Sequence, residues 1–411
     1  MPSRHILIIV QNLPVPLDRR VWLECQALVA AGYEVSVICP KGPGDPGYQH
    51  LDGVDLYKYR PAPATHGLLA YLWEFSYSWV RTAALSRKIW RRKRFDVIQA
   101  CNPPDTYWAL AVLYRRQGVR FVFDEHDLNP EVFISRFGEP KGLMARSQYA
   151  ALRWLQRQTY RAAHQVISTN ESYREIAMKR GGKSPHEVTV VRSGPDTTAM
   201  QRSTARPELR RGRDHLAVYL GIMGPQDGVD LALRAMAHLV HDMGRRDVHL
   251  ALLGFGDCYD DLVRLSKELG LIDYVTFTGR AGPELIEAYL STADIGIQPD
   301  PFNPLNNVST MNKTMEYMSY ELPVVTFDLK ETRVSAGETA LYVQPNDVWA
   351  FAATMGELFD DPERRARMGE SARSRAVNEL DWKPQRDRYV SVYDELLRAD
   401  QQPLSSDLQP S

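Results

Sequence analysis

A charged pair in the second half of the chain has the types and spacing needed to bind a nucleotide. Lys313 and Glu316 lie three residues apart in MNKTMEYMSY, where Ser309 or Thr310 can cap a helix. The N–H groups at a helix start attract phosphate, and Lys313 adds a mobile positive charge. A carboxylate at Glu316 can accept two hydrogen bonds from a ribose diol. The segment therefore predicts a nucleotide-diphosphate site; the alternative is a capped surface helix with an ion pair.

A second group of polar residues ends an apolar strand in the first half of the chain. The run FVFDEHD places Asp124, Glu125, His126 and Asp127 where a buried strand should stop. Polar groups at the carboxyl end of a strand are costly to bury unless they serve a function. His126 can donate to a sugar hydroxyl or a phosphate oxygen, or relay a proton; the alternative is a structural histidine. A metal site here would lack a typical ligand spacing.

Glycines and an arginine add weaker signals. Gly254 and Gly256 flank Phe255 at the end of an apolar run, and glycine allows the backbone to approach a ligand closely. An ordinary tight turn explains the same spacing. Arg280 follows Gly279 at another strand end, where a surface salt bridge is the alternative to a ligand contact.

The elements that must position these residues alternate along the chain. Short apolar runs such as 5–10, 95–100 and 120–125 are separated by helix-length segments, which predicts parallel βαβ units and doubly wound sheets. The pattern pauses over 193–213, which lacks an apolar period, and then resumes. The sequence therefore predicts an α/β protein with two Rossmann-like parallel-sheet domains, whose default ligand site is the cleft between them.

Composition narrows the class of protein. The net charge is −1 and 44% of residues are hydrophobic, which excludes a mostly disordered chain. Basic residues exceed acidic ones in the first half, and the reverse holds in the second. The cysteines form no Cys-x-x-Cys pair, and neither a leader peptide nor an apolar run of about 20 residues is visible. We expect a cytoplasmic protein.

Three missing patterns exclude other functions. The chain has no Asp-x-Asp, no Gly-x4-Gly-Lys-Ser/Thr, and no Gly-x-Gly-x-x-Gly after the first strand. These absences disfavour a metal-chelated nucleotide site, a P-loop NTPase and a nicotinamide-dependent dehydrogenase respectively. No nucleic-acid-binding motif accompanies the basic residues, so we expect no nucleic-acid partner.

A basic stretch over 68–95 interleaves aromatic residues with cations. Between Arg81 and Arg94 it contains seven basic residues and no acidic one. Such a helix can lie on an anionic bilayer, which would place the protein peripherally at the inner face of the membrane. The alternative is a helix packed on the sheet with a solvated basic face.

The order of these segments resembles the family 4 glycosyltransferases of the GT-B architecture, in which two Rossmann-like domains face a central cleft. The resemblance runs from RRVWLECQALVAAGYEVSVICP through EVTVVRSGPD, LGIMGPQDGVDLALRAM, LALLGFGD and FTGRAGPELIEAYLSTADIGIQPD to MNKTMEYMSYELPVV. It implies a retaining enzyme that moves a sugar from a nucleotide diphosphate sugar to an acceptor, without a metal or cofactor. The acceptor would be a saccharide, a lipid-linked saccharide or a small molecule.

The resemblance also implies roles and domain limits. His126 and Glu316 would be catalytic. Donor-binding residues would be Gly221, Gly224, Gly254, Gly256, Arg280, Met311, Asn312, Lys313 and Glu316, and acceptor-binding residues would be Asp18, Arg19, Arg20 and Asp127. We expect an acceptor domain over 1–195, a linker over 196–213, a donor domain over 214–383, a helix over 384–399 that returns to the first domain, and a disordered tail over 400–411.

Three positions depart from the family pattern. Val308 stands where the first glutamate of Glu-x7-Glu would be, and Ile222 and Asp227 stand where phosphate-binding Arg and Lys would be. The diphosphate would then rely on backbone N–H groups at Gly224 and around Met311 and Asn312, helped by Lys313. These replacements resemble enzymes of bacterial surface polysaccharide synthesis. They also keep open a sugar-nucleotide epimerase and a non-catalytic GT-B binding subunit.

Overall fold

The computed structural model describes residues 4–62 and 68–398, without the side chains of 68–72. The predicted disordered tail, 400–411, lies outside these residues. The chain divides into two compact units. The first contains Met1–Val132, Pro140–Val191 and Pro384–Ser411, and the second contains Phe133–Glu139 and Arg192–Lys383.

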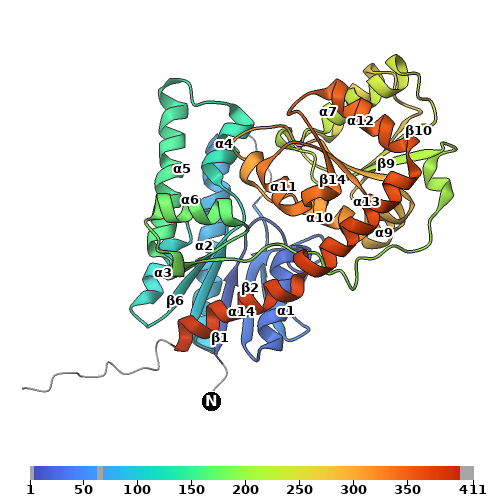
Figure 1. Ribbon diagram of the computed structural model, residues 1–411. Helices are drawn as coiled ribbons and strands as arrows, with labels where there is room; N and C mark the ends of the chain where they lie inside the picture. The colour runs from blue at the N-terminus through green and yellow to red at the C-terminus, as the bar shows by residue number, and fades with distance from the viewer. Residues whose placement is uncertain (1–3, 63–67, 399–411) are drawn as a thin grey trace, which may run out of the picture. The chain divides into compact units, whose positions relative to one another are not determined.

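The first unit is built on an eight-stranded sheet in the order β3-β4-β2-β1-β5-β6-β7-β8 (Figure 1). Every neighbouring pair is parallel except β3 and β4. The strands are β1 (His5–Ile9), β2 (Glu34–Pro40), β3 (Tyr48–Leu51), β4 (Val54–Tyr59), β5 (Val97–Cys101), β6 (Arg120–Glu125), β7 (Gln165–Ser168) and β8 (Val188–Val190).

Helices cover this sheet, and polar caps mark where some of them begin. The Asp18 carboxylate accepts from the Val21 N–H at 3.2 Å, and the Asn170 side chain caps a later helix in the same way. One face of the sheet packs against apolar side chains such as Ile89 and Tyr160. The helices of this part of the chain are α1 (Arg19–Ala30), α2 (Leu68–Arg92), α3 (Trp108–Arg115), α4 (Asn129–Phe137), α5 (Gly142–Ala162) and α6 (Glu171–Gly181).

The second unit contains a six-stranded, fully parallel sheet in the order β11-β10-β9-β12-β13-β14. Its strands are β9 (His215–Leu220), β10 (Val248–Leu253), β11 (Val275–Gly279), β12 (Ile295–Gln298), β13 (Val324–Phe327) and β14 (Ala340–Val343). Its helices are α7 (Val229–Ala237), α8 (Tyr259–Glu268), α9 (Pro283–Thr292), α10 (Asn312–Ser319), α11 (Lys330–Ala336), α12 (Val348–Asp360) and α13 (Pro362–Arg375).

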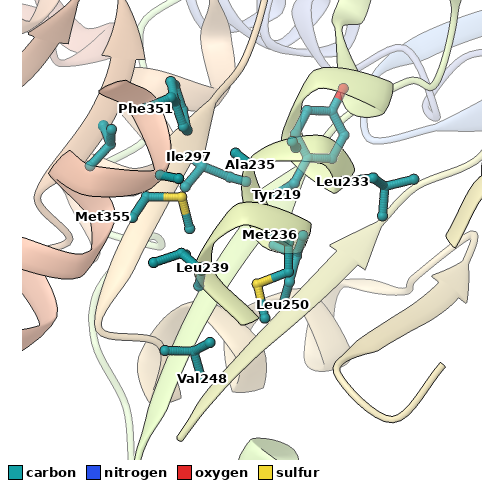
Figure 2. Packing of buried hydrophobic residues seen from close by; sticks show 14 of the residues in the cluster. Tyr219, Leu233, Ala235, Met236, Leu239, Val248, Leu250, Ile297, Phe351 and Met355 are labelled. Carbon is teal, nitrogen blue, oxygen red and sulfur yellow. The ribbon is translucent and has the colours of Figure 1, made fainter. Parts of the chain in front are cut away.

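The core of the second unit lies between this sheet and the helices α7 and α12. Met236 of α7 and Phe351 and Met355 of α12 pack against Leu250 and Ile297 from the strands (Figure 2). These side chains are at most 1% exposed. Burial of each such side chain stabilises the unit by about 1.5–3 kcal/mol, so the sheet is a rigid base for the loops at its edge.

Both sheets have a point where the order of strands reverses. In the first unit it lies between β1 and β5, and in the second between β9 and β12. Loops leave the carboxyl ends of the two strands in opposite directions there, which opens a crevice where doubly wound folds bind ligands. The two reversal points therefore locate the candidate sites.

The last helix, α14 (Trp382–Arg398), contains residues of both units. Its first two residues cluster with the second unit, and the rest cluster with the first. In the first unit it contacts the turn after α1, where the Tyr33 hydroxyl donates to Asp394 at 2.5 Å. The first unit is thus completed by the end of the chain.

Candidate functional site

Lys313 lies at the reversal point of the second unit, but it is fixed rather than mobile. Its Nζ donates to both carboxylate oxygens of Asp300, at 2.9 and 3.0 Å, and lies 3.9 Å from Asp227. It also lies 4.9 Å from the centroid of the Tyr219 ring. Burial alone would lower the pKa of Lys313, but Asp300 and Asp227 raise it above its ordinary value. The expected mobile charge is therefore a buried cation held by two carboxylates.

The helix that carries Lys313 begins later than the sequence suggests. Its N-cap is Met311, without a side-chain cap hydrogen bond, so the expected cap at Ser309 or Thr310 is wrong. The Ser309 hydroxyl instead donates to the Leu305 carbonyl at 2.8 Å, at the end of a 3-10 turn. Asn312 and Lys313 consequently occupy the first turn of α10, where backbone N–H groups lack partners within the helix.

The Gly224 N–H, which we expected to contact the diphosphate, already donates to Asp227. The Gly224 N–H donates to Asp227 Oδ2 at 2.9 Å. Burial raises the pKa of Asp227 to about 6, an effect that Lys313 opposes and Asp300 reinforces. Gly224 therefore offers this N–H to a ligand only if the carboxylate moves away.

Gly254 and Gly256 serve packing between two loops. A Cβ built on Gly254 would lie 1.8 Å from the Gly221 carbonyl oxygen, and one on Gly256 would lie 2.6 Å from the Met223 oxygen. The Met223 N–H donates to Phe255 O at 2.9 Å across the same contact. The Gly-x-Gly spacing thus brings the β10–α8 loop against the loop after β9, a role that does not require a ligand.

Gly254→Ala should destabilise the second unit by at least about 3 kcal/mol, because backbone must shift to admit the methyl group. Gly282→Ala is the matched control, since a Cβ there meets nothing within 4 Å and the residue is a helix N-cap with φ −78°. We expect the control to change stability by about 1 kcal/mol or less. Urea unfolding followed by circular dichroism measures both, and equal stability of the two variants would contradict the loop contact.

Glu316 lies on α10, and Arg280 directly follows β11. Glu316 is half-buried, one turn beyond Lys313 on α10. The Arg280 guanidinium stacks on the Phe255 ring, 4.1 Å from its centroid. Among the described residues Arg280 forms no ion pair, so the structure does not show the salt bridge of the alternative interpretation. The stacking instead joins the end of β11 to the Gly-x-Gly loop.

In the first unit, His126 and Arg20 meet over a buried carboxylate. Asp124 accepts from Arg20 Nη2 at 2.9 Å and lies 2.6 Å from His126 Nε2. Glu24 completes the group, with Oε1 3.0 Å from Arg20 Nε. Burial would raise the pKa of Asp124, but the two cations hold it well below its usual range. Burial and Asp124 raise the pKa of Glu24.

His126 is a hydrogen-bond donor at neutral pH. Burial alone would lower its pKa, but the charge and hydrogen bond of Asp124 raise it to about 9. The charged imidazolium carries N–H groups on both nitrogens, so Nε2 donates to Asp124. The 3.2 Å approach of Arg20 Nε to the same nitrogen is then a contact between like charges. In this charged form His126 can donate to an oxygen.

The pKa of His126 gives a test of this arrangement. In a 13C-histidine NMR titration, we expect His126 to titrate near pH 9, and below its ordinary 6.5 in Asp124→Asn, where burial and Arg20 remain. His126→Asn assigns the resonance, and Asp127→Asn is the matched control. Because the folded pKa is raised, stabilisation by charged His126 is complete below pH 6.5 and is lost as the pH rises through 9. An unchanged titration in Asp124→Asn would contradict the pair.

Few features of the amino-acid sequence indicate the residues that support this cluster. The Gln99 amide nitrogen donates to Glu24 at 2.8 Å and to Asp124 at 3.2 Å, and its oxygen accepts from the hydroxyls of Tyr389, at 2.6 Å, and Tyr393. Both amide atoms are thus used, which fixes how the side chain is oriented. The available signal was a glutamine inside the apolar strand FDVIQA and two tyrosines four residues apart on the last helix.

The remaining residues predicted to bind the acceptor lie near this cluster in different settings. Asp18 caps α1 with its carboxylate. Arg19 is half-buried at the start of the same helix. The Asp127 backbone is held by Asn102, which receives its N–H at 3.2 Å and donates to its carbonyl at 2.6 Å. The structure therefore brings Arg20 and His126 together and gives Asp18 a structural role.

Three side chains of the cluster have the types that bind metal ions. Ligand atoms of Cys101, Asp124 and His126 all lie within 4.8 Å of one another. Burial and the nearby carboxylates raise the pKa of the Cys101 thiol well above its ordinary value, and a thiolate is the form that binds metals. Arg20 already donates to Asp124. The cluster is consequently organised as a hydrogen-bonded charge network.

Helix α2 uses its apolar side to pack on the first sheet. Ile89 is buried in the core, and Trp90 contacts Phe95 with ring centroids 4.9 Å apart. The exposed face of the helix and the turn after it contain the basic residues Arg81, Arg87, Lys88, Arg91, Arg92, Lys93 and Arg94. Side chains of 68–72, in the predicted membrane-binding stretch, lie outside the described residues. Nowhere in the described chain is a helix both long and apolar enough to span a bilayer.

Comparison with known families identifies both halves of the chain. Residues 17–194 match the glycosyl transferase 4-like domain, and residues 214–361 match the glycosyl transferases group 1 domain. The chain belongs to the family 4-like glycosyltransferases. The expected enzyme class is thereby confirmed.

Curated relatives of this glycosyltransferase have related names. Alpha-D-kanosaminyltransferase of Streptomyces kanamyceticus is 27% identical over 62% of this chain and 67% of its own length. An uncharacterised glycosyltransferase of Methanocaldococcus jannaschii is 23% identical over 90% of this chain and 91% of its own. In three other relatives, the aligned region covers 57%, 52% and 56% of their length.

Solved structures confirm the GT-B fold of this glycosyltransferase. Sucrose-phosphate synthase of Thermosynechococcus elongatus matches with a TM-score of 0.77 and 19% identity, over 97% of this chain and all of the other. The Anabaena protein HepE in complex with UDP-glucose matches with a TM-score of 0.70 and 16% identity, over 95% and 99% of the two chains. Because the sequence identities are this low, the two matches show a shared fold and do not show a shared function.

Proposed function

We propose that this glycosyltransferase moves a sugar, with retention of configuration, from a nucleoside diphosphate sugar to an acceptor. The observation that supports it most is the buried ammonium of Lys313, in the first turn of α10 at the reversal point of the second sheet. A cation and the N–H groups at a helix start suit a diphosphate. Glu316, one turn later, is suited to a ribose diol, and the complex of HepE with UDP-glucose agrees with such a donor.

The first unit would bind the acceptor through Arg19, Arg20 and Asp127, near His126. Charged His126 would donate to a sugar hydroxyl or to a phosphate oxygen, which agrees with its raised pKa. In the transfer step the bond from the anomeric carbon to the diphosphate oxygen breaks, and a bond to the acceptor oxygen forms on the same face. The proton of the acceptor hydroxyl passes to the leaving diphosphate. Stabilising the charge of that leaving group is the main electrostatic task, and we propose that neither a metal nor a cofactor is required.

The proposal extends to a role in polysaccharide or glycoconjugate synthesis, with a saccharide, lipid-linked or small-molecule acceptor. Neither an epimerase nor a binding subunit is favoured by three of the relatives, whose names are those of transferases. Incubating the protein with a panel of nucleoside diphosphate sugars, read by mass spectrometry, tests the function. Release of a nucleoside diphosphate supports transfer. An interconverted sugar, or binding without turnover, contradicts it.

We further propose that the exposed basic face of α2, from Arg81 to Arg94, contacts an anionic membrane surface at the inner face of the membrane. The charge of this face is suited to anionic lipid. Flotation with phosphatidylglycerol and phosphatidylcholine liposomes tests it, with Arg87→Glu/Arg91→Glu as the variant. Equal flotation with both lipids would contradict the contact.

A further inference from the structure

The Asp227 carboxylate interacts with two groups that the proposed donor site needs to bind phosphate, the Gly224 N–H and the Lys313 ammonium. It ends the 3-10 turn Pro225–Asp227, directly after the loop that follows β9. One of its oxygens accepts the Gly224 N–H at 2.9 Å, and the other lies 3.9 Å from Lys313 Nζ. A backbone N–H and an ammonium are the usual partners of a phosphate oxygen. A carboxylate of the protein therefore already fills the place of an anionic ligand.

The charges around Lys313 affect whether a diphosphate can bind there. Asp300 and Asp227 together carry two negative charges against one positive charge when both are ionised. Arg136, on the segment Phe133–Glu139 that clusters with the second unit, also lowers the pKa of Asp227, and the titratable groups of Tyr219 and Cys258 interact with the same carboxylate. A diphosphate brings about two further negative charges into this place. Its binding is repelled unless one of the carboxylates loses its charge.

Asp227 is the carboxylate placed to lose its charge. Burial of the Asp300 side chain, which is 1% exposed, raises its pKa, but its two hydrogen bonds from Lys313, at 2.9 and 3.0 Å, favour the charged form. The Asp227 side chain is 16% exposed and lies a full ångström farther from the ammonium. Burial raises the pKa of Asp227 to about 6, which makes it easier to protonate than an ordinary aspartate.

We propose that Asp227 is a donor-gating residue, which takes up one proton from solvent when a nucleoside diphosphate sugar binds. Protonation removes the anion that competes for Lys313 and lets the carboxyl leave the Gly224 N–H, so that phosphate oxygens take both partners. This inference rests on the proposed function and adds a regulation of the same site by pH. It also gives a role to a position where the family pattern has a lysine.

The expected pH dependence follows from a single required proton. Above the pKa of Asp227 the dissociation constant of the donor should rise about tenfold per pH unit, and below it the constant should level off. Between pH 5 and pH 8 this amounts to about a 100-fold loss of affinity. Asp227→Asn keeps the size of the side chain and an oxygen that can accept from Gly224, but removes the charge. Its affinity should be independent of pH, and stronger than that of the wild type at pH 8.

Calorimetric titration with UDP-glucose and with GDP-mannose tests the proposal. Both probes carry a diphosphate diester that does not titrate between pH 5 and 8. Titrations in two buffers of different ionisation enthalpy count the protons taken up on binding. Asp260→Asn is the matched control, because Asp260 is an exposed aspartate on α8 of the same unit.

Three outcomes decide between the ideas. Proton uptake by the wild type and the Asp260→Asn variant, absent in Asp227→Asn, supports the gate. Binding that is pH-independent in the wild type and unchanged in Asp227→Asn overturns the gate, and leaves the proposed donor site standing. Failure of the wild type and Asp227→Asn to bind either probe at any pH overturns the gate, and failure to bind any donor of the panel overturns the proposed function as well.

Discussion

Replacing Lys313 and Asp300 together, in Lys313→Met/Asp300→Asn, should lower kcat/KM for transfer by at least about 100-fold while the fold persists. The ammonium of Lys313 is the buried cation at the reversal point of the second sheet, where charge develops on the leaving diphosphate. Removing Lys313 alone would leave Asp300 buried without a partner, at a cost of about 3–5 kcal/mol. The double change removes both charges and separates loss of function from loss of stability.

Steady-state kinetics with the donor found in the panel measures this effect, and thermal unfolding checks the fold. Lys330→Met is the matched control, because Lys330 is an exposed lysine in the first turn of α11 in the same unit. We expect its kcat/KM to stay within about twofold of the wild type. A double variant that folds and retains wild-type kcat/KM would show that the donor site lies elsewhere.

Gln99→Leu should destabilise the first unit by about 3 kcal/mol. The change leaves the hydroxyls of Tyr389 and Tyr393 without their acceptor, and deprives the buried carboxylates of Glu24 and Asp124 of a donor. Each buried polar group that loses its partner costs about 1–3 kcal/mol, and relaxation of the helix recovers part of that sum. Because His126 is held by Asp124, its pKa should change as well, which a purely local packing defect would not cause.

Urea unfolding measures the loss of stability, and histidine NMR measures the pKa. Gln117→Leu provides the control, since Gln117 is exposed just after α3 in the same unit and the change there should cost less than about 0.5 kcal/mol. Equal stabilities of the two variants would show that the tyrosines and carboxylates have other partners, and that α14 does not support the cluster.

The sheets, and the polar residues at the ends of their strands, could be predicted from sequence, because they depend on local patterns. Apolar runs alternating with helix-length segments require covered parallel strands, and polar residues after a strand such as β6 must lie at its carboxyl end. Lys313 was correctly expected at the start of a helix. The assignment of Glu316 and His126 to catalysis stays a prediction.

What could not be predicted depends on pairs far apart in sequence. Lys313 looked mobile because its partner, Asp300, follows a different strand, and only the sheet order brings the two together. The role of Gln99 could not be predicted, because its acceptor oxygen is satisfied by Tyr389 from 290 residues later. The glycines of the Gly-x-Gly loop looked like ligand contacts, although the neighbouring loop explains them. A local sequence pattern does not indicate which distant residues will be partners in the fold.

The place of α14 has a consequence for how the chain folds during synthesis. Tyr389 and Tyr393 are translated only after Arg192–Lys383, the main segment of the second unit, has been synthesised. At typical elongation rates of about 5–20 residues per second, the first unit waits about 10–40 seconds with Gln99 and two carboxylates lacking these partners. A nascent chain arrested before residue 389 should therefore be more sensitive to protease in its first unit than the finished protein. Vectorial synthesis thus favours completion of the second unit before the first.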